Sequence, residues 1–123
     1  MKYMILIYGN AQSRQVFEGL SPAQRSEGLK VYAALTEDLN ASGEMIVSAP
    51  LADASLTKRV LVREGRTTTT DGPFAEVKEQ LAGFYFIECD SLERAVEYAA
   101  RIPEASHGLV EVRPTMDLSA FEL

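Results

Sequence analysis

Two stretches of the chain are apolar on both faces of an extended strand, and this pattern limits the possible folds more than any other feature. Successive side chains of a strand point to opposite faces, so alternating residues share a face. In residues 2–8 both sets are apolar: Tyr3, Ile5 and Ile7 on one face, and Met4, Leu6 and Tyr8 on the other. Residues 84–89 nearly repeat the pattern, with Phe84 and Phe86 opposite Tyr85, Ile87 and Cys89. We therefore expect a sheet that needs cover on both faces.

Two segments carry the period of amphipathic helices. The first begins after Ser21, with Pro22 in its first position and Gln24 placed to complete a capping box, and Ser42-Gly43 ends it. Its predicted apolar face holds Leu29, Tyr32, Leu35 and Leu39. The second follows Asp90-Ser91 and ends at Pro103, and its predicted buried stripe is Leu92, Ala95, Val96, Ala99 and Ile102. Residues 11–20 have no clean period and predict a loop or an irregular helical turn.

The order of the remaining strands defines the expected fold. Strands are predicted at 44–49, 58–63, 67–70, 81–89 and 109–113, with a hairpin turn at 64–66. With the hairpin set aside, the order is strand–helix–strand twice, which is the ferredoxin-like split βαβ pattern of an α+β protein. We predict a single domain over residues 1–123 with an inserted β-hairpin. Both helices of this fold cover one face, so we predict a homodimer in which the sheets meet face to face.

Composition and charge exclude several classes of function. Twelve Lys and Arg against eighteen Asp and Glu give a net charge of −6, which disfavours a nucleic-acid partner. The apolar run at the N-terminus is too short to cross a membrane and lacks a signal-peptide cleavage site, so a cytoplasmic protein is expected. One cysteine, Cys89, and one histidine, His107, cannot assemble a zinc site from this chain. No phosphate loop or dinucleotide fingerprint occurs, so we expect neither a metal nor a cofactor.

The most distinctive segment runs from Thr70 to Tyr85. Asp71-Gly72-Pro73 predicts a turn, since Asp accepts backbone donors, Gly allows a positive φ, and Pro fixes the next φ. The turn sets the direction of the following aromatic residue, Phe74. A short polar stretch comes next, in which Lys78 can pair with Glu76 or Glu79, and Gly83 permits close backbone approach in the following strand.

This segment resembles the DGPF family of YCII-related proteins, and the resemblance extends over nearly the whole chain. It also includes residues 2–8, 20–22, 82–85, 99–103, Gly108 and 110–114. The resemblance implies a dimeric α+β barrel whose biochemical role is largely unassigned, and a possible regulatory link to extracytoplasmic-function sigma factors. The wider YCII group is similar to muconolactone-isomerase-like and dehalogenase-like enzymes, and the resemblance implies a His–Asp pair as the site of the group. The resemblance implies a histidine in the region of the first helix, but residues 22–39 of this chain contain none. The only histidine, His107, precedes the last strand.

The last strand gives the best sequence evidence for a pocket. Glu111 and Arg113 alternate with Val110 and Val112, so the two charged residues share one face of the sheet. The valines are the natural partners of the helices, which turns the charged pair toward the opposite face. If a second copy covers that face, the pair belongs either to a buried ion network or to the lining of a polar cavity.

Each remaining candidate has a functional and a structural interpretation. Asp71 is either a general base or ligand contact, or it caps its own turn. Phe74 either fills the core or dimer interface or stacks on a substrate. Lys78 with its acidic neighbours either orients an anionic ligand or forms a solvated charge cluster. His107 can transfer protons near neutral pH, but a lone histidine in a loop is more often a surface residue.

Three hypotheses for the function follow. The leading one is a small-molecule-binding or regulatory homodimer whose sheet cavity holds a small polar or acidic ligand. The residues predicted to bind it are Asp71, Gly72, Pro73, Phe74, Lys78, Glu79, Glu111 and Arg113. The alternative is a cofactor-independent lyase or isomerase with Asp71 as general base and His107 or Lys78 as proton donor. The third is an interaction module that binds an extracytoplasmic-function sigma factor.

Overall fold

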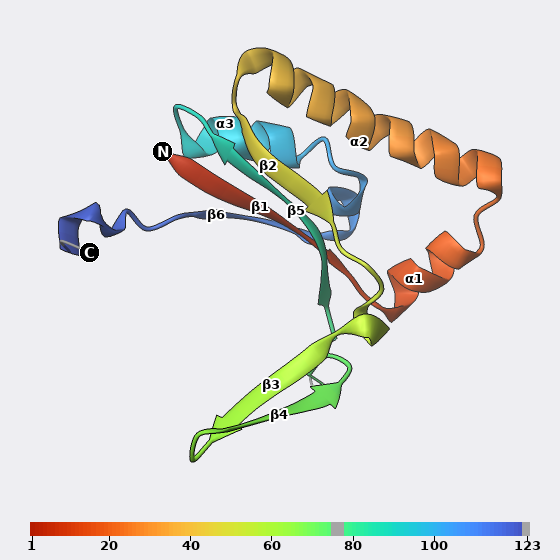
Figure 1. Ribbon diagram of the computed structural model, residues 1–123. Helices are drawn as coiled ribbons and strands as arrows, with labels where there is room; N and C mark the ends of the chain where they lie inside the picture. The colour runs from red at the N-terminus through yellow and green to blue at the C-terminus, as the bar shows by residue number, and fades with distance from the viewer. Residues whose placement is uncertain (75–77, 122–123) are drawn as a thin grey trace.

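The computed structural model describes residues 1–74 and 78–121, and its body is a four-stranded antiparallel sheet covered by helices on one face (Figure 1). The strand order is β2-β5-β1-β6, formed by β2 (Met45–Pro50), β5 (Gln80–Glu88), β1 (Lys2–Gly9) and β6 (Val110–Pro114). Helices α2 (Pro22–Ser42) and α3 (Leu92–Ala99) connect β1 to β2 and β5 to β6. This arrangement confirms the predicted α+β, ferredoxin-like split βαβ fold, while the dimer stays a prediction.

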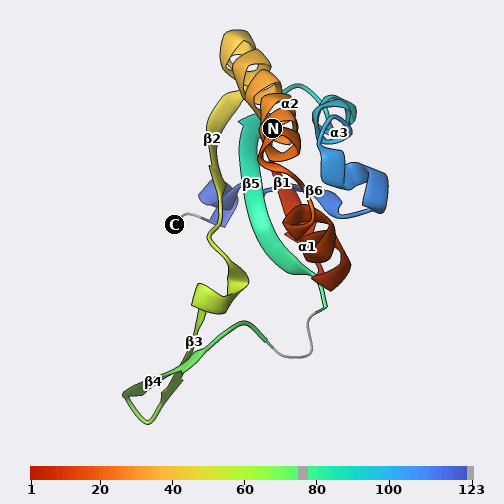
Figure 2. The ribbon, with the colours of Figure 1, turned by 90° about the vertical axis from the view of Figure 1, so that its right-hand side faces the viewer.

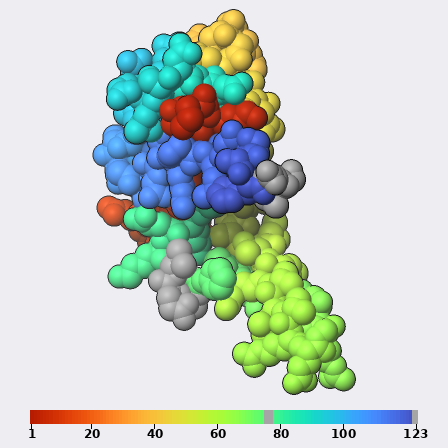
Figure 3. Space-filling model, turned by 90° about the vertical axis from the view of Figure 1, so that its left-hand side faces the viewer, coloured from red at the N-terminus to blue at the C-terminus, as the bar shows by residue number. Residues whose placement is uncertain are grey.

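The inserted hairpin forms a separate two-stranded sheet. Strands β3 (Lys58–Arg63) and β4 (Arg66–Asp71) pair with each other and project away from the body (Figures 1 and 3). The tight turn between them needs positive φ at both central residues, and Glu64 (φ 50°) and Gly65 (φ 75°) provide it. A short 3-10 turn, η1 (Ala54–Leu56), joins the hairpin to β2. The predicted hairpin and its position in the chain are confirmed.

The segment after β1 is a regular helix, α1 (Ala11–Glu18), and the prediction of a loop or irregular turn there was wrong. Asn10 caps this helix: its side-chain oxygen accepts from the backbone N–H of Ser13, and the Asn10 N–H donates to the Ser13 hydroxyl, both at 2.8 Å. The helix has no buried residue. It forms from local capping rather than burial, so its sequence has no apolar period.

Both ends of α2 and the start of α3 are as predicted, but α3 ends at Ala99, before the predicted stop at Pro103, and Pro103 instead begins a 3-10 turn, η2 (Pro103–His107). The buried faces of the two helices also differ in part from the prediction. In α2 the Ser21–Gln24 capping box and the left-handed Gly43 (φ 79°) are present, and Leu35 and Leu39 are fully buried. Leu29, however, is 67% exposed, because its half of the helix lies over a cavity. Of the predicted stripe, Ala95 and Ala99 of α3 and Ile102 just after it are buried. Leu92 and Val96 are about half exposed, and Tyr98 is buried instead.

The hydrophobic core lies between the helices and one face of the sheet. The core residues of β1 and β5 pack there with residues of α2 and α3; they are Tyr3, Ile5, Ile7, Tyr85 and Ile87. The opposite face, which we call the open face, pairs Met4 with Phe86 and Leu6 with Phe84, and all four are partly exposed. Both apolar faces predicted from the alternation are therefore present. Within the described ranges, no helix is long and apolar enough to cross a membrane.

Candidate functional site

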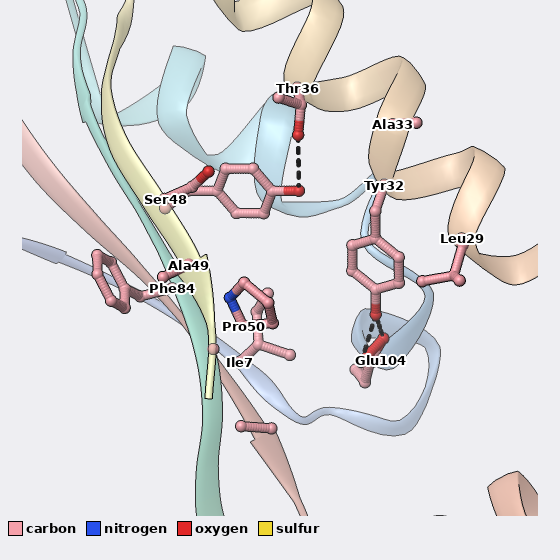
Figure 4. A pocket seen from close by; sticks show the side chains of 13 residues that line it. Ile7, Leu29, Tyr32, Ala33, Thr36, Ser48, Ala49, Pro50, Phe84 and Glu104 are labelled. Carbon is pink, nitrogen blue, oxygen red and sulfur yellow. Dashed lines mark hydrogen bonds between the residues drawn. The ribbon is translucent and has the colours of Figure 1, made fainter. Parts of the chain in front are cut away.

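A cavity of about 310 Å³ lies between α2 and the sheet (Figure 4). Side chains of α2 form one wall, the ends of β2 and β5 with Ile7 of β1 form the opposite wall, and the 3-10 turn η2 (Pro103–His107) contributes Glu104. Most of the lining is apolar, including Leu29 near the cavity edge and Pro50 facing it. The volume is at the lower end of the range for small-molecule sites, so the space suits a molecule the size of one ring.

A tyrosine–carboxylate pair lies at the η2 side of the cavity. The Tyr32 hydroxyl donates a hydrogen bond to the Glu104 carboxylate, across 72 positions of sequence (Figure 4). Burial raises the pKa of Tyr32 well above its ordinary value, and the hydrogen bond to Glu104 and its negative charge raise it further. Tyr32 is therefore a neutral phenol at physiological pH and does not act as a phenolate base. Its single O–H is donated to Glu104, so its oxygen is left to accept a hydrogen bond.

A second polar pair lies deeper in the cavity. The hydroxyl of Thr36 and that of the buried Tyr85 are 3.3 Å apart, so one donates to the other. Ser48 of β2 contributes a further hydroxyl to the lining. The cavity therefore combines apolar walls with hydrogen-bonding oxygens near two of its ends, an arrangement that can orient a small ring with polar substituents.

The open face of the sheet carries the charged pair predicted from the last strand. Glu111 is opposite Leu6 and Arg113 opposite Met4, so both point away from the helices, whereas Val110 and Val112 pack against the core. The pKa of Tyr8 is raised, mainly by a hydrogen bond with Glu111. Burial and the negative charge of Glu111 raise this pKa further, whereas the positive charge of Arg113 lowers it.

The open face therefore carries a cluster of three residues, which we call the open-face cluster: Tyr8, Glu111 and Arg113. Glu79 lies close enough to raise the Tyr8 pKa slightly. The surrounding residues of β1 and β5 are apolar. A second chain that packed on these residues would also bury the open-face cluster.

The turn at residues 71–73 lies at the base of the hairpin rather than beside the open-face cluster. Asp71 forms an ion pair with Lys58 of the neighbouring strand, and its side chain is 81% exposed. Gly72 has the positive φ (84°) expected from the turn, and its N–H donates to the carbonyl of Thr57 at 2.8 Å. The guanidinium of Arg59 lies 4.4 Å from the centre of the Phe74 ring.

The other candidates lie apart from this turn. Lys78 and Glu79 are exposed and precede β5, Pro73 is half-buried, and Glu76 falls outside the described residues. His107 is exposed at the end of η2, on the same short turn as Glu104. Within one chain, Asp71 ends strand β4 of the hairpin, which projects away from the body (Figure 1), whereas His107 ends η2, so these two residues lie on separate parts of the fold. Among the residues that the structure describes, no group of His, Cys, Asp and Glu could hold a metal ion.

Sequence reasoning missed the cavity residues Thr36, Tyr85, Ser48 and Glu104, and it assigned Tyr32 to the core. The one available signal was Tyr32 itself, since a tyrosine on an apolar helix face usually needs a partner for its hydroxyl. The partner, Glu104, follows the predicted helix end at Pro103, and nothing in the local pattern places it against α2.

The fold and these two sites define a small ferredoxin-like α+β protein with polar groups on both sides of its sheet. The chain belongs to the YCII-related domain family, whose model matches residues 1–119. It is 33% identical over 116 residues to an uncharacterized protein of Rhizobium meliloti, with 93% of this chain and 91% of that protein covered.

Its fold is similar to that of a solved structure, 5-chloro-2-hydroxyhydroquinone dehydrochlorinase from Burkholderia phenoliruptrix, which was determined in complex with 2,5-dihydroxybenzoquinone. The TM-score is 0.53 and the identity 18%, and the match covers 94% of each chain. At this identity the likeness shows the shared fold.

Proposed function

We propose that this protein binds a small, uncharged, single-ring molecule with hydroxyl or carbonyl groups in the cavity between α2 and the sheet. The observation that carries the proposal is the lining of that cavity. Its walls are mainly apolar, and it presents the Tyr32–Glu104 pair and the Thr36–Tyr85 pair to an occupant. The oxygen-bearing ring bound by the structural relative supports the same class of ligand. A negatively charged ligand is disfavoured, because it would approach the Glu104 carboxylate.

The geometry favours binding over catalysis. The raised pKa of Tyr32 keeps its phenol protonated, and its single O–H bonds Glu104, so it suits accepting a hydrogen bond from a ligand hydroxyl better than proton abstraction. Asp71, the general base of the lyase or isomerase hypothesis, is exposed and paired with Lys58 on the hairpin. These observations support a binding or regulatory role, and a sigma-factor partner stays a prediction from the resemblance.

We also propose that the functional unit is a homodimer formed through the open face. On this face four apolar side chains are partly exposed in a single chain: Met4, Leu6, Phe84 and Phe86. The helices α2 and α3 lie on the other side of the sheet (Figure 2). Such a surface usually marks an interface. The dimer would enclose the open-face cluster, where Glu111 and Arg113 offset each other's charge. Sedimentation would give twice the chain mass of 13.5 kDa, and a monomer at high micromolar concentration would refute the dimer.

Titration of ¹⁵N-labelled protein with catechol and hydroquinone, followed by two-dimensional NMR, tests the binding proposal. We expect saturable shifts at amides of α2, β2 and η2 that line the cavity, and no such shifts with benzoate, a negatively charged ring of similar size. Tyr32→Phe removes one hydrogen bond and should weaken binding by about 2- to 10-fold.

Tyr8→Phe is the matched control, because it makes the same chemical change on the opposite face of the sheet. Its affinity should equal that of the unmodified protein. The proposal fails if no uncharged ring gives saturable shifts at the cavity, or if Tyr32→Phe and Tyr8→Phe affect binding equally.

A further inference from the structure

The β3–β4 hairpin has two chemically different faces, and both are exposed. On one face Val60 and Val62 lie opposite Thr69 and Thr67, and the two valines are 66% and 61% exposed. The other face carries three arginines and one leucine: Arg59, Arg63, Arg66 and Leu61. A two-stranded ribbon is only marginally stable by itself in water, and this one leaves its valines unpacked. The hairpin therefore has the character of an element that packs against another chain.

The two strands of the hairpin are joined at their base. The Lys58–Asp71 ion pair links them, and the Gly72 N–H bonds to the Thr57 carbonyl. Arg59 stacks on Phe74 just beyond the end of β4. A ribbon whose strands are already joined loses less conformational freedom on binding than two separate segments. The residues of the distinctive turn thus help to keep the hairpin formed.

The hairpin projects on the side of the sheet that the helices leave uncovered (Figures 1 and 2). The C-terminal segment after β6 projects on the same side, and its apolar residues Met116, Leu118 and Phe121 are exposed. Two arms with exposed apolar side chains therefore flank the open face. A second copy of the chain on that face would lie within reach of both.

The charge of the hairpin indicates which partner it suits. Residues 58–71 hold four of the chain's twelve Lys and Arg but two of its eighteen Asp and Glu, so their formal charge is +2 and that of the rest is −8. The body of a second copy is therefore electrostatically complementary to the hairpin. This argument, together with the position beside the open face, favours another copy of this chain over an unrelated protein.

We propose that the β3–β4 hairpin is an arm that binds a second copy of this chain. Its Val60–Val62 face packs on the partner, and its arginine face lies next to the partner's acidic body. The inference rests on the proposed homodimer and extends it, because the interface then includes an exchanged arm from each chain as well as the two open faces.

Sedimentation equilibrium of the full chain and of the double variant Val60→Ser/Val62→Ser tests the arm. Because two valines from each chain would lose buried apolar area, we expect the dimer dissociation constant to rise at least about tenfold. Val16→Ser/Val31→Ser is the matched control, since these valines are exposed on the helices α1 and α2, and its dissociation constant should not change. Arg63→Glu/Arg66→Glu keeps the valines and should also weaken the dimer, by a factor that shrinks as salt is added.

Cross-linking an equimolar mixture of ¹⁴N- and ¹⁵N-labelled chains with an amine reagent locates the arm independently. Lys58 is the only lysine of the hairpin, and mixed-isotope peptides that contain it would show contact between copies. A dimer whose dissociation constant is unchanged in both hairpin variants, with Lys58 linked only within its own chain, would overturn the arm and leave the open-face dimer standing. A monomeric unmodified protein would overturn both, and neither result bears on the cavity.

Discussion

A partly buried carboxylate just before β2 makes the stability of this protein depend on acid pH. Glu44 receives two hydrogen bonds from the Arg94 guanidinium, at 3.1 and 3.2 Å, and a third from the Tyr98 hydroxyl. The bonds from Arg94 are the main cause of a Glu44 pKa lowered from 4.5 to about 2; burial opposes the shift, and Tyr98 and Ser42 reinforce it. This cluster joins the end of α2 to α3 through residues far apart in sequence.

The size of the effect follows from the shift. One pKa unit corresponds to about 1.4 kcal/mol, so the full shift corresponds to about 3 kcal/mol of folding free energy at neutral pH. Arg94 is 46% exposed, so solvent screening reduces the contribution, and we expect about 1–2 kcal/mol. Because the folded-state pKa lies below the unfolded value, this stabilisation is complete above about pH 5 and is lost as the pH falls from 4.5 toward 2.

Urea unfolding of the unmodified protein and of Glu44→Gln, measured from pH 7 to pH 2.5, tests this reasoning. The free energy of unfolding should differ by about 1–2 kcal/mol at pH 7, and the difference should shrink steadily below pH 4.5. Glu37→Gln, a change at an exposed carboxylate of α2, should give no such pH-dependent difference. A difference for Glu44→Gln that stays constant from pH 7 to pH 3 would refute the electrostatic explanation.

Four further substitutions test the packing and the cap of α1. A Cβ at position 83 would lie 3.2 Å from the Ala49 carbonyl oxygen, so Gly83→Ala should destabilise the protein by about 1 kcal/mol or more, read from the urea midpoint. Leu39→Ala should cost about 2–5 kcal/mol in the same assay, and Leu29→Ala less than about 0.5 kcal/mol, because Leu39 is fully buried and Leu29 is largely exposed. Asn10→Ala should cost about 1 kcal/mol and should speed hydrogen exchange in α1 before the sheet is affected.

Local rules predicted most of the fold. The Ser21–Gln24 capping box and the Gly43 end of α2 depend on a few adjacent residues, so the sequence is enough to locate them. The same holds for the two apolar faces of β1, because strand alternation is fixed by backbone geometry. The alternation, together with the assignment of Val110 and Val112 to the helix side, placed Glu111 on the open face, and the register opposite Leu6 confirms it.

The errors occur where tertiary position decides. Leu92 and Val96 have the right spacing for a buried stripe, yet α3 turns Tyr98 inward because its hydroxyl finds Glu44 and Arg94 beside it. A prediction from spacing assigns burial to apolar residues. It takes no account of a polar side chain that gains a hydrogen-bond partner from a distant part of the sequence. For the same reason Tyr98, whose ring is buried, was absent from the predicted stripe.

The distinctive turn can be recognised in the sequence because its residues are adjacent, whereas the cavity cannot, because its residues come from distant segments. The turn at Asp71 and Gly72 is conspicuous because adjacent residues must satisfy one tight geometry, and that geometry fixes the base of the hairpin arm. The cavity is inconspicuous because its polar groups come from α2, β2, β5 and η2, which meet only in the folded chain. Tyr32 and Glu104 are 72 positions apart and share no local pattern. The most recognisable motif of this chain therefore fits the organisation of an interface, and the groups best suited to hold a ligand lie among ordinary helix and turn residues on the opposite side of the sheet.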